Sequence, residues 1–185
     1  MTQFFHLPAN GYRTMPWKNG RGATDEVWLW PEDADREDFS IRISRAPITD
    51  DGGFSAFEGA DRVITLIEGR GLGLDFAEGQ HRIAPHVPFQ FDTGLAPFGR
   101  PLGGPVRVFN VMARRADWVI ADARVTEEPA EWQGDLVVAF ALAPQSILCG
   151  GEEITLAAQD TVVLRDPARV LATKGPVLVV TLRAA

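Results

Sequence analysis

Short runs in which apolar and polar residues alternate constrain the fold of this chain most. Residues 39–46 and residues 62–67 both alternate in this way, and an acidic, Gly-rich turn lies between them. Because strand side chains point to opposite faces at every second residue, Arg42 and Ser44 share one face of the first run, and Arg62 opens the second run. The pattern predicts two β-strands that are neighbours and that bring two arginines together.

The same rhythm of strands and turns returns later in the chain. Residues 137–165 can be aligned with residues 63–91 with, at most, a one-residue shift near the Gly turn. Short strands at this spacing, with almost no helical periodicity, are typical of an all-β barrel or sandwich. We therefore expect an all-β jelly roll of two stacked halves, residues 1–126 and residues 127–185, packed as one unit.

Composition narrows the class of partner and the compartment. The chain has 185 residues, a net charge of −7 and one cysteine. Nucleic acids and anionic membranes need a basic surface, so neither is expected as a partner. A single cysteine allows no intrachain disulfide, and no segment is apolar enough to span a membrane. We expect a cytoplasmic protein.

Three segments carry a resemblance to a known family. They are PWKNGRGATDEV at residues 16–27, FSIRISRAPITDDGGFSAFEGADRVITLIEGRGLGL at residues 39–74 and FNVMARR at residues 109–115. With them the chain resembles the HutD/Ves family of bacterial proteins, whose fold is a double-stranded β-helix (jelly roll) bicupin. The resemblance implies a metal-free protein that binds a small acidic intermediate of histidine degradation, such as N-formylglutamate or urocanate. The Ves branch implies a cold or stress response instead.

The histidines do not have the pattern of a cupin metal centre. Metal-binding cupins usually combine a His-x-His pair with a carboxylate and a later histidine, because imidazole and carboxylate suit first-row divalent metals. His6, His81 and His86 lack this spacing, and Cys149 has no neighbouring histidine to activate it. We therefore expect no metal, no cofactor and no catalytic nucleophile.

Arginine is the residue type best suited to bind a carboxylate in this chain. Its guanidinium presents a planar fork of donors that binds a carboxylate bidentately. Arg62, which follows a Gly turn, and Arg42 are the leading candidates. The other candidate ligand-binding residues supply apolar walls and neutral polar contacts. They are Trp17, Asn19, Thr24, Glu26, Ser44, Phe54 and Ser55.

A strand at residues 24–30 follows a Gly-rich loop. Strict alternation places Glu26, Trp28 and Trp30 on one face, so Trp28 is expected in the apolar wall of the site. The loop serves either as a tight turn or as a ligand-facing segment, and the sequence leaves both interpretations open.

Three functions fit this sequence. The first is a small-molecule-binding protein that recognises a small carboxylate metabolite and has a regulatory or buffering role. The second is a metal-independent isomerase or epimerase in which Glu26 or a histidine is the general base. The third is a structural or interaction protein that forms a homodimer through edge strands. In that case no sizeable pocket is expected near Arg62. A structural interpretation of Arg62 itself is that it pairs with Asp61, Glu58 or Glu26 to close the barrel mouth.

Overall fold

The computed structural model describes residues 3–17, 20, 22–165 and 171–185, and these are mostly β-strand. The helical segments within this part of the chain are two short 3-10 turns, η1 (Ala9–Gly11) and η2 (Thr93–Leu95). Within the same ranges, no helix has the length and apolar character needed to cross a membrane.

The chain divides into two compact units. Arg13–Trp118 forms the first, called the N-terminal unit below. Met1–Tyr12 and Val119–Ala185 form the second, called the C-terminal unit. The first strand of the chain is therefore part of the unit that contains the C-terminal residues.

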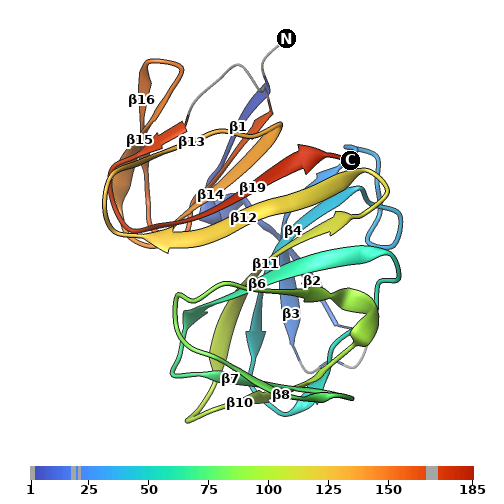
Figure 1. Cartoon of the computed structure of the whole chain (residues 1–185). Coiled ribbons are helices and arrows are strands. Elements are labelled where there is room, and N and C mark those ends of the chain that lie inside the picture. The colour runs from blue at the N-terminus through green and yellow to red at the C-terminus, as the bar shows by residue number, and fades with distance from the viewer. Residues whose placement is uncertain (1–2, 18–19, 21, 166–170) are drawn as a thin grey trace. The chain divides into compact units, whose positions relative to one another are not determined.

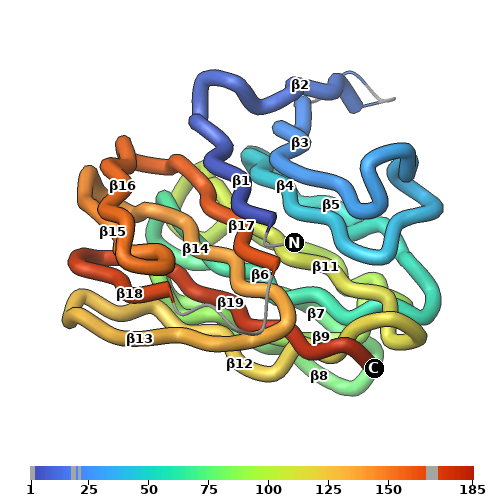
Figure 2. The backbone as a smooth tube through the Cα atoms, turned by 90° about the horizontal axis from the view of Figure 1, so that it is seen from above, coloured from blue at the N-terminus to red at the C-terminus, as the bar shows by residue number. Residues whose placement is uncertain are grey.

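Strand β1 (Gln3–Leu7) joins the C-terminal unit by pairing antiparallel with β17 (Thr161–Arg165). Figure 2 shows the two strands side by side. The expected division into residues 1–126 and 127–185 instead places β1 in the N-terminal half. Alternation identifies a strand but does not say which sheet it joins.

Two antiparallel sheets build the N-terminal unit. The larger consists of β2 (Arg13–Pro16), β3 (Ala23–Trp30), β4 (Ile41–Ile48), β11 (Val106–Arg114), β6 (Ala60–Glu68) and β9 (Phe89–Asp92), in that spatial order. The smaller consists of β5 (Gly52–Gly53), β10 (Phe98–Pro101), β7 (Leu72–Phe76) and β8 (Gly79–Ile83), also in spatial order. Figure 1 shows β7, β8 and β10 as a layer apart from β3, β4, β6 and β11.

A cluster of apolar side chains from both sheets forms the core of the N-terminal unit. Every second residue of each strand points into this interior, as the alternating sequence predicts. Each such side chain stabilises the fold by about 1.5–3 kcal/mol relative to an exposed one. The cluster consists of Ile64, Leu66, Leu72, Leu74, Ile83, Phe91, Val106 and Val108.

The C-terminal unit repeats this plan. One sheet has the order β1, β17, β14 (Leu136–Ala141), β19 (Val177–Ala184) and β12 (Trp118–Thr126). The other has the order β13 (Ala130–Trp132), β18 (Leu171–Thr173), β15 (Gln145–Cys149) and β16 (Glu152–Leu156). Strands β14 to β17 correspond to β6 to β9, and β19 pairs with β14 as β11 pairs with β6. The predicted all-β bicupin is confirmed.

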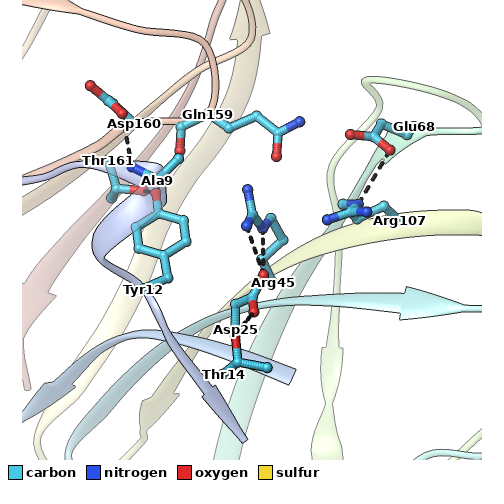
Figure 3. A network of polar contacts seen from close by, with 10 residues as sticks. All are labelled: Ala9, Tyr12, Thr14, Asp25, Arg45, Glu68, Arg107, Gln159, Asp160 and Thr161. Atoms are coloured by element: carbon cyan, nitrogen blue, oxygen red, sulfur yellow. Dashed lines mark hydrogen bonds and ion pairs between the residues drawn. The ribbon is translucent and has the colours of Figure 1, made fainter. Parts of the chain in front are cut away.

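Asp160 holds the N-terminal segment within the C-terminal unit. Its Oδ1 accepts a hydrogen bond from the backbone N–H of Ala9 at 2.9 Å, as Figure 3 shows. Its Oδ2 accepts one from the backbone N–H of Ala157 at 3.0 Å and contacts His6 Nε2 at 3.0 Å. Burial raises the pKa of Asp160, but these hydrogen bonds outweigh burial and leave the pKa below its ordinary value.

Candidate anion-binding site

Two buried arginines lie in one row across the larger sheet of the N-terminal unit. Met112 on β11 pairs with Arg42 on β4 and with Arg62 on β6. Residues opposite each other on adjacent strands share a face, so both arginines project from the same face. This is the interior face, because Arg62 is in phase with the core residue Ile64. The prediction that the two strands are neighbours is wrong, since β11 lies between them.

Arg42 has a counter-ion inside the protein. Its Nε donates to Glu26 Oε1 at 2.8 Å, and its terminal nitrogen donates to Glu26 Oε2 at 3.2 Å. Arg36 approaches the same carboxylate at 3.6 Å. Arg42 is 5% exposed and Glu26 is 8% exposed, so this is a buried and bidentate ion pair. Two positive charges beside Glu26 stabilise its ionised form and so oppose its use as a general base.

Arg62 has no counter-ion among the described residues. It is 6% exposed, its Nε is buried without a hydrogen-bond partner, and no side chain in the described ranges forms an ion pair with it. Its guanidinium carbon lies 5.2 Å from the ring centroid of Phe54 and 5.7 Å from that of Phe91. Burial, with the charge of Arg42 as a second cause, lowers the pKa of Arg62 to about 10. The guanidinium therefore remains protonated at neutral pH.

None of the three acidic residues predicted as ion-pair partners of Arg62 contacts it among the described residues. Asp61 accepts a hydrogen bond from Arg115 at 2.7 Å. Glu26 is bound by Arg42. No contact joins Glu58 to Arg62 in the part of the chain that the structure describes. A buried cation without a counter-ion is unfavourable. A bound anion beside Arg62 would therefore stabilise this arrangement.

Asn110 is a second polar side chain without a partner on the same face. It precedes Met112 by two residues on β11, and it pairs in register with Ser44 and Ile64. It is 6% exposed, and its buried Oδ1 has no hydrogen-bond partner among the described residues. Sequence reasoning included Asn110 in a family motif but not in the site. Asn110 and Met112 are two residues apart on one strand, so the alternating pattern could have placed both on the same face.

The structure brings most of the predicted site residues to this interior. Thr24 and Glu26 share a face of β3, and Trp17 Nε1 donates to Thr24 Oγ1 at 2.8 Å. Phe54 lies against Arg62. Ser55 is exposed, and no contact connects it with either arginine. Asn19 falls outside the described residues.

A β-bulge turns Trp28 and Trp30 away from this site. Glu26 pairs with Ser44, whereas Trp28 pairs with Ile43, and the register shifts between Glu26 and Trp28. An inserted residue reverses the alternation beyond it. The prediction that Trp28 lines the site is therefore wrong. The two tryptophans instead stack on each other, with ring centroids 5.8 Å apart.

Trp17 and Gly22, on either side of the Gly-rich segment before β3, contact each other. The backbone N–H of Trp17 donates to the carbonyl of Gly22 at 2.8 Å. A Cβ on Gly22 would lie 2.8 Å from the Trp17 ring, so the glycine lets the indole pack against the backbone. Residues 18, 19 and 21 lie outside the described residues, so both interpretations of this loop stay predictions.

Histidines do not contribute to this site. His81 stacks on Phe89, with ring centroids 3.8 Å apart, and His6 belongs to the other unit. Among the described residues, no group of three or more His, Cys, Asp or Glu side chains is arranged to hold a metal ion. The absence of a metal cofactor stays a prediction.

Comparison with known proteins places these features in a family context. A family model described as HutD matches residues 9–179. An uncharacterized 21.2 kDa protein in the hutC 3′ region of Pseudomonas putida is 37% identical over 114 residues, which are 60% of this chain. The match spans 59% of the length of that curated relative.

Solved structures agree with the family match. The structure of HutD from Pseudomonas fluorescens SBW25 is 28% identical, with a TM-score of 0.85, and the match covers 99% of this chain and 100% of that one. A conserved protein of unknown function from Pseudomonas aeruginosa PAO1 is 26% identical, with a TM-score of 0.87 and coverage of 98% and 99%. Because the family model spans nearly the whole chain and the fold agrees, this protein belongs to the HutD family of bicupin proteins.

Proposed function

We propose that this protein binds a small carboxylate metabolite through Arg62 and has a regulatory or buffering role. The observation that carries the proposal is the buried, protonated guanidinium of Arg62, which has no counter-ion among the described residues. A bound carboxylate would supply the missing negative charge and accept bidentate hydrogen bonds. The chain has a net charge of −7, so general attraction to anions does not explain such a site.

The aromatic contacts of Arg62 are compatible with this role. The rings of Phe54 and Phe91 contact the guanidinium through its π system and use none of its N–H donors. The donors remain for a ligand. Mostly apolar walls with a few polar groups are typical of small-molecule sites.

Family membership supports the chemical class of the ligand. HutD proteins are associated with histidine utilisation, and the Pseudomonas putida relative is described by its place beside hutC. N-formylglutamate and urocanate are carboxylates of histidine degradation. We therefore infer that the ligand is of this type and that binding, without catalysis, is the main activity.

Isothermal titration of the metal-free protein at low salt tests this proposal. N-formylglutamate, urocanate and glutamate are the three ligands, and Arg62→Met is the variant. We expect saturable binding of at least one of the first two to the wild type and its loss in the variant. Unchanged affinity in Arg62→Met would remove Arg62 from the site, and no binding of any carboxylate would refute the proposal.

Arg45 offers a matched control. It lies on β4 one residue after Ser44, so it points to the opposite face, where it donates to Asp25 at 2.7 and 3.0 Å (Figure 3). Arg45→Met removes an equal charge from the same sheet as Arg62. Its carboxylate binding should equal that of the wild type, whereas a loss as large as that of Arg62→Met would indicate a nonspecific charge effect.

A further inference from the structure

We infer that Asn110 Oδ1 accepts a hydrogen bond from a neutral N–H group of the ligand. The site would then select N-acylated or heteroaromatic carboxylates over free amino acids. This inference rests on the proposed carboxylate function and specifies the second feature that the ligand must carry.

The register places Asn110 next to Arg62 on one face. Arg62 pairs directly with Met112, and Asn110 lies two residues before Met112 on the same strand. The two positions are thus diagonal neighbours on adjacent strands, about 7–8 Å apart. Both residues are more than nine-tenths buried, and each has a buried polar atom without a partner among the described residues.

An unpaired buried oxygen requires a donor. Buried polar side-chain atoms in folded proteins almost always have a hydrogen-bond partner, and an exception marks a position where a partner is missing. Ser44, the nearest polar residue in register, makes no hydrogen bond to Asn110. A ligand whose carboxylate binds Arg62 and whose N–H reaches Asn110 satisfies both atoms at once.

The local charge decides that this N–H is neutral. Arg36 and Arg42 share the single carboxylate of Glu26, and Arg62 adds a third positive charge. A ligand carboxylate neutralises Arg62, but Glu26 still offsets only one of Arg36 and Arg42. An ammonium group in this interior would be repelled by the remaining positive charge, and the Asn110 amide carries no charge to offset it. A formamide or imidazole N–H meets the same oxygen without that repulsion.

Matched ligand pairs test the inference on the wild-type protein by calorimetric titration at pH 8. N-formylglutamate is compared with 2-(formyloxy)glutarate, in which an ester oxygen replaces the N–H. Urocanate is compared with its oxazole analogue, which has the same replacement in the ring. We expect the N–H compound of the binding pair to bind about tenfold to a hundredfold more tightly, because the analogue leaves Oδ1 buried and unpaired. Glutamate should bind at least tenfold more weakly than N-formylglutamate.

The variant Asn110→Leu closes a double-mutant cycle. It removes the acceptor and keeps a side chain of similar size, so the preference for the N–H compound should disappear. Equal affinity of the N–H compound and its oxygen analogue for the wild type would overturn the role of Asn110 while leaving carboxylate binding through Arg62 intact. A preference that persists in Asn110→Leu would also overturn it. Glutamate binding as tightly as N-formylglutamate would refute selection of a neutral N–H.

The cycle also separates this inference from the proposed function. Failure of every carboxylate to bind the wild type refutes both. Loss of binding in Arg62→Met, with no difference between the matched ligands, supports the carboxylate site and rejects Asn110 as its acceptor. The ligand comparison on the wild type decides the question even if Asn110→Leu does not fold.

Discussion

At the scale of single residues, Arg42 and Arg62 show how one residue type serves two purposes. Arg42 forms a bidentate pair with Glu26, and removing it would leave that carboxylate buried without a partner. Arg62 has no such partner in the part of the chain that the structure describes, so its charge opposes folding of the unliganded protein. Because burial lowers its pKa to about 10, below the value in the unfolded chain, this unfavourable contribution is present at neutral pH. The free energy of unfolding should increase only as the pH rises above 10, where the buried guanidinium loses its proton.

Replacement of Arg62 should therefore stabilise the unliganded protein. Arg62→Met keeps the volume and removes a buried, unpaired charge, so the free energy of unfolding should rise by about 1–3 kcal/mol. Arg45→Met should lower it, because Asp25 loses its partner. Urea unfolding of both variants without ligand measures the two effects. Destabilisation by Arg62→Met would assign Arg62 a structural role.

At the scale of elements, turns and bulges decide where side chains point. The bulge in β3 turns Trp28 away from the site. Gly69 lies between β6 and β7, and its φ of +108° is in a region that favours glycine. A Cβ there would lie 2.7 Å from Val106 Cγ1 and 3.0 Å from its Cα. The glycine lets the chain pass close to the start of β11.

Gly69→Ala should be strongly destabilising. The added methyl group both strains the backbone, by about 1–2 kcal/mol, and meets Val106. Gly104→Ala is the matched control, because Gly104 has a φ of +117° with nothing within 4 Å of the added atom. Thermal unfolding should show a larger loss for Gly69→Ala than for Gly104→Ala. Equal losses would mean that backbone strain alone explains both.

At the scale of the whole molecule, the chain begins and ends in the same unit. Strand β1 pairs with β17, and Asp160 binds the segment that follows β1. Two of its bonds come from backbone N–H groups that need an acceptor. A carboxylate suits this position because both of its oxygens accept.

Asp160→Asn should destabilise the protein at neutral pH by about 1–3 kcal/mol, because an amide offers one acceptor and faces an N–H with its other end. The pKa of Asp160 lies below 3.8 in the folded protein, so its contribution is present above 3.8 and is lost as the pH falls through the folded pKa. Thermal unfolding across this range should show the wild type and the variant converging in acid.

Glu153→Gln is the control for this experiment. The pKa of Glu153 is also lowered, by hydrogen bonds from Ser146 and Lys174, but the residue is exposed. Exposed pairs contribute little to stability, so this variant should resemble the wild type at every pH. A constant difference between Asp160→Asn and the wild type down to strong acid would show that the charge of Asp160 is unimportant.

Much of the fold could be read from the sequence because its signals are local. Alternation identified most of the strands, and the rhythm shared by residues 63–91 and 137–165 predicted the two cupin repeats. Alternation also placed Arg42 and Ser44 on one face of their strand, as the register of β4 with β11 confirms. Each of these inferences needs only neighbouring residues, because a strand repeats its direction every two residues.

By itself, the sequence determined that this protein is an all-β bicupin and named Arg42 and Arg62 as candidate ligand contacts. The tertiary structure alone decided which strand lies between Arg42 and Arg62, that Glu26 neutralises only the first of them, and that Asn110 faces the same interior. The physical reason is that pairing and burial depend on residues far apart in the chain. An unpaired charge becomes visible only when every candidate partner has been placed.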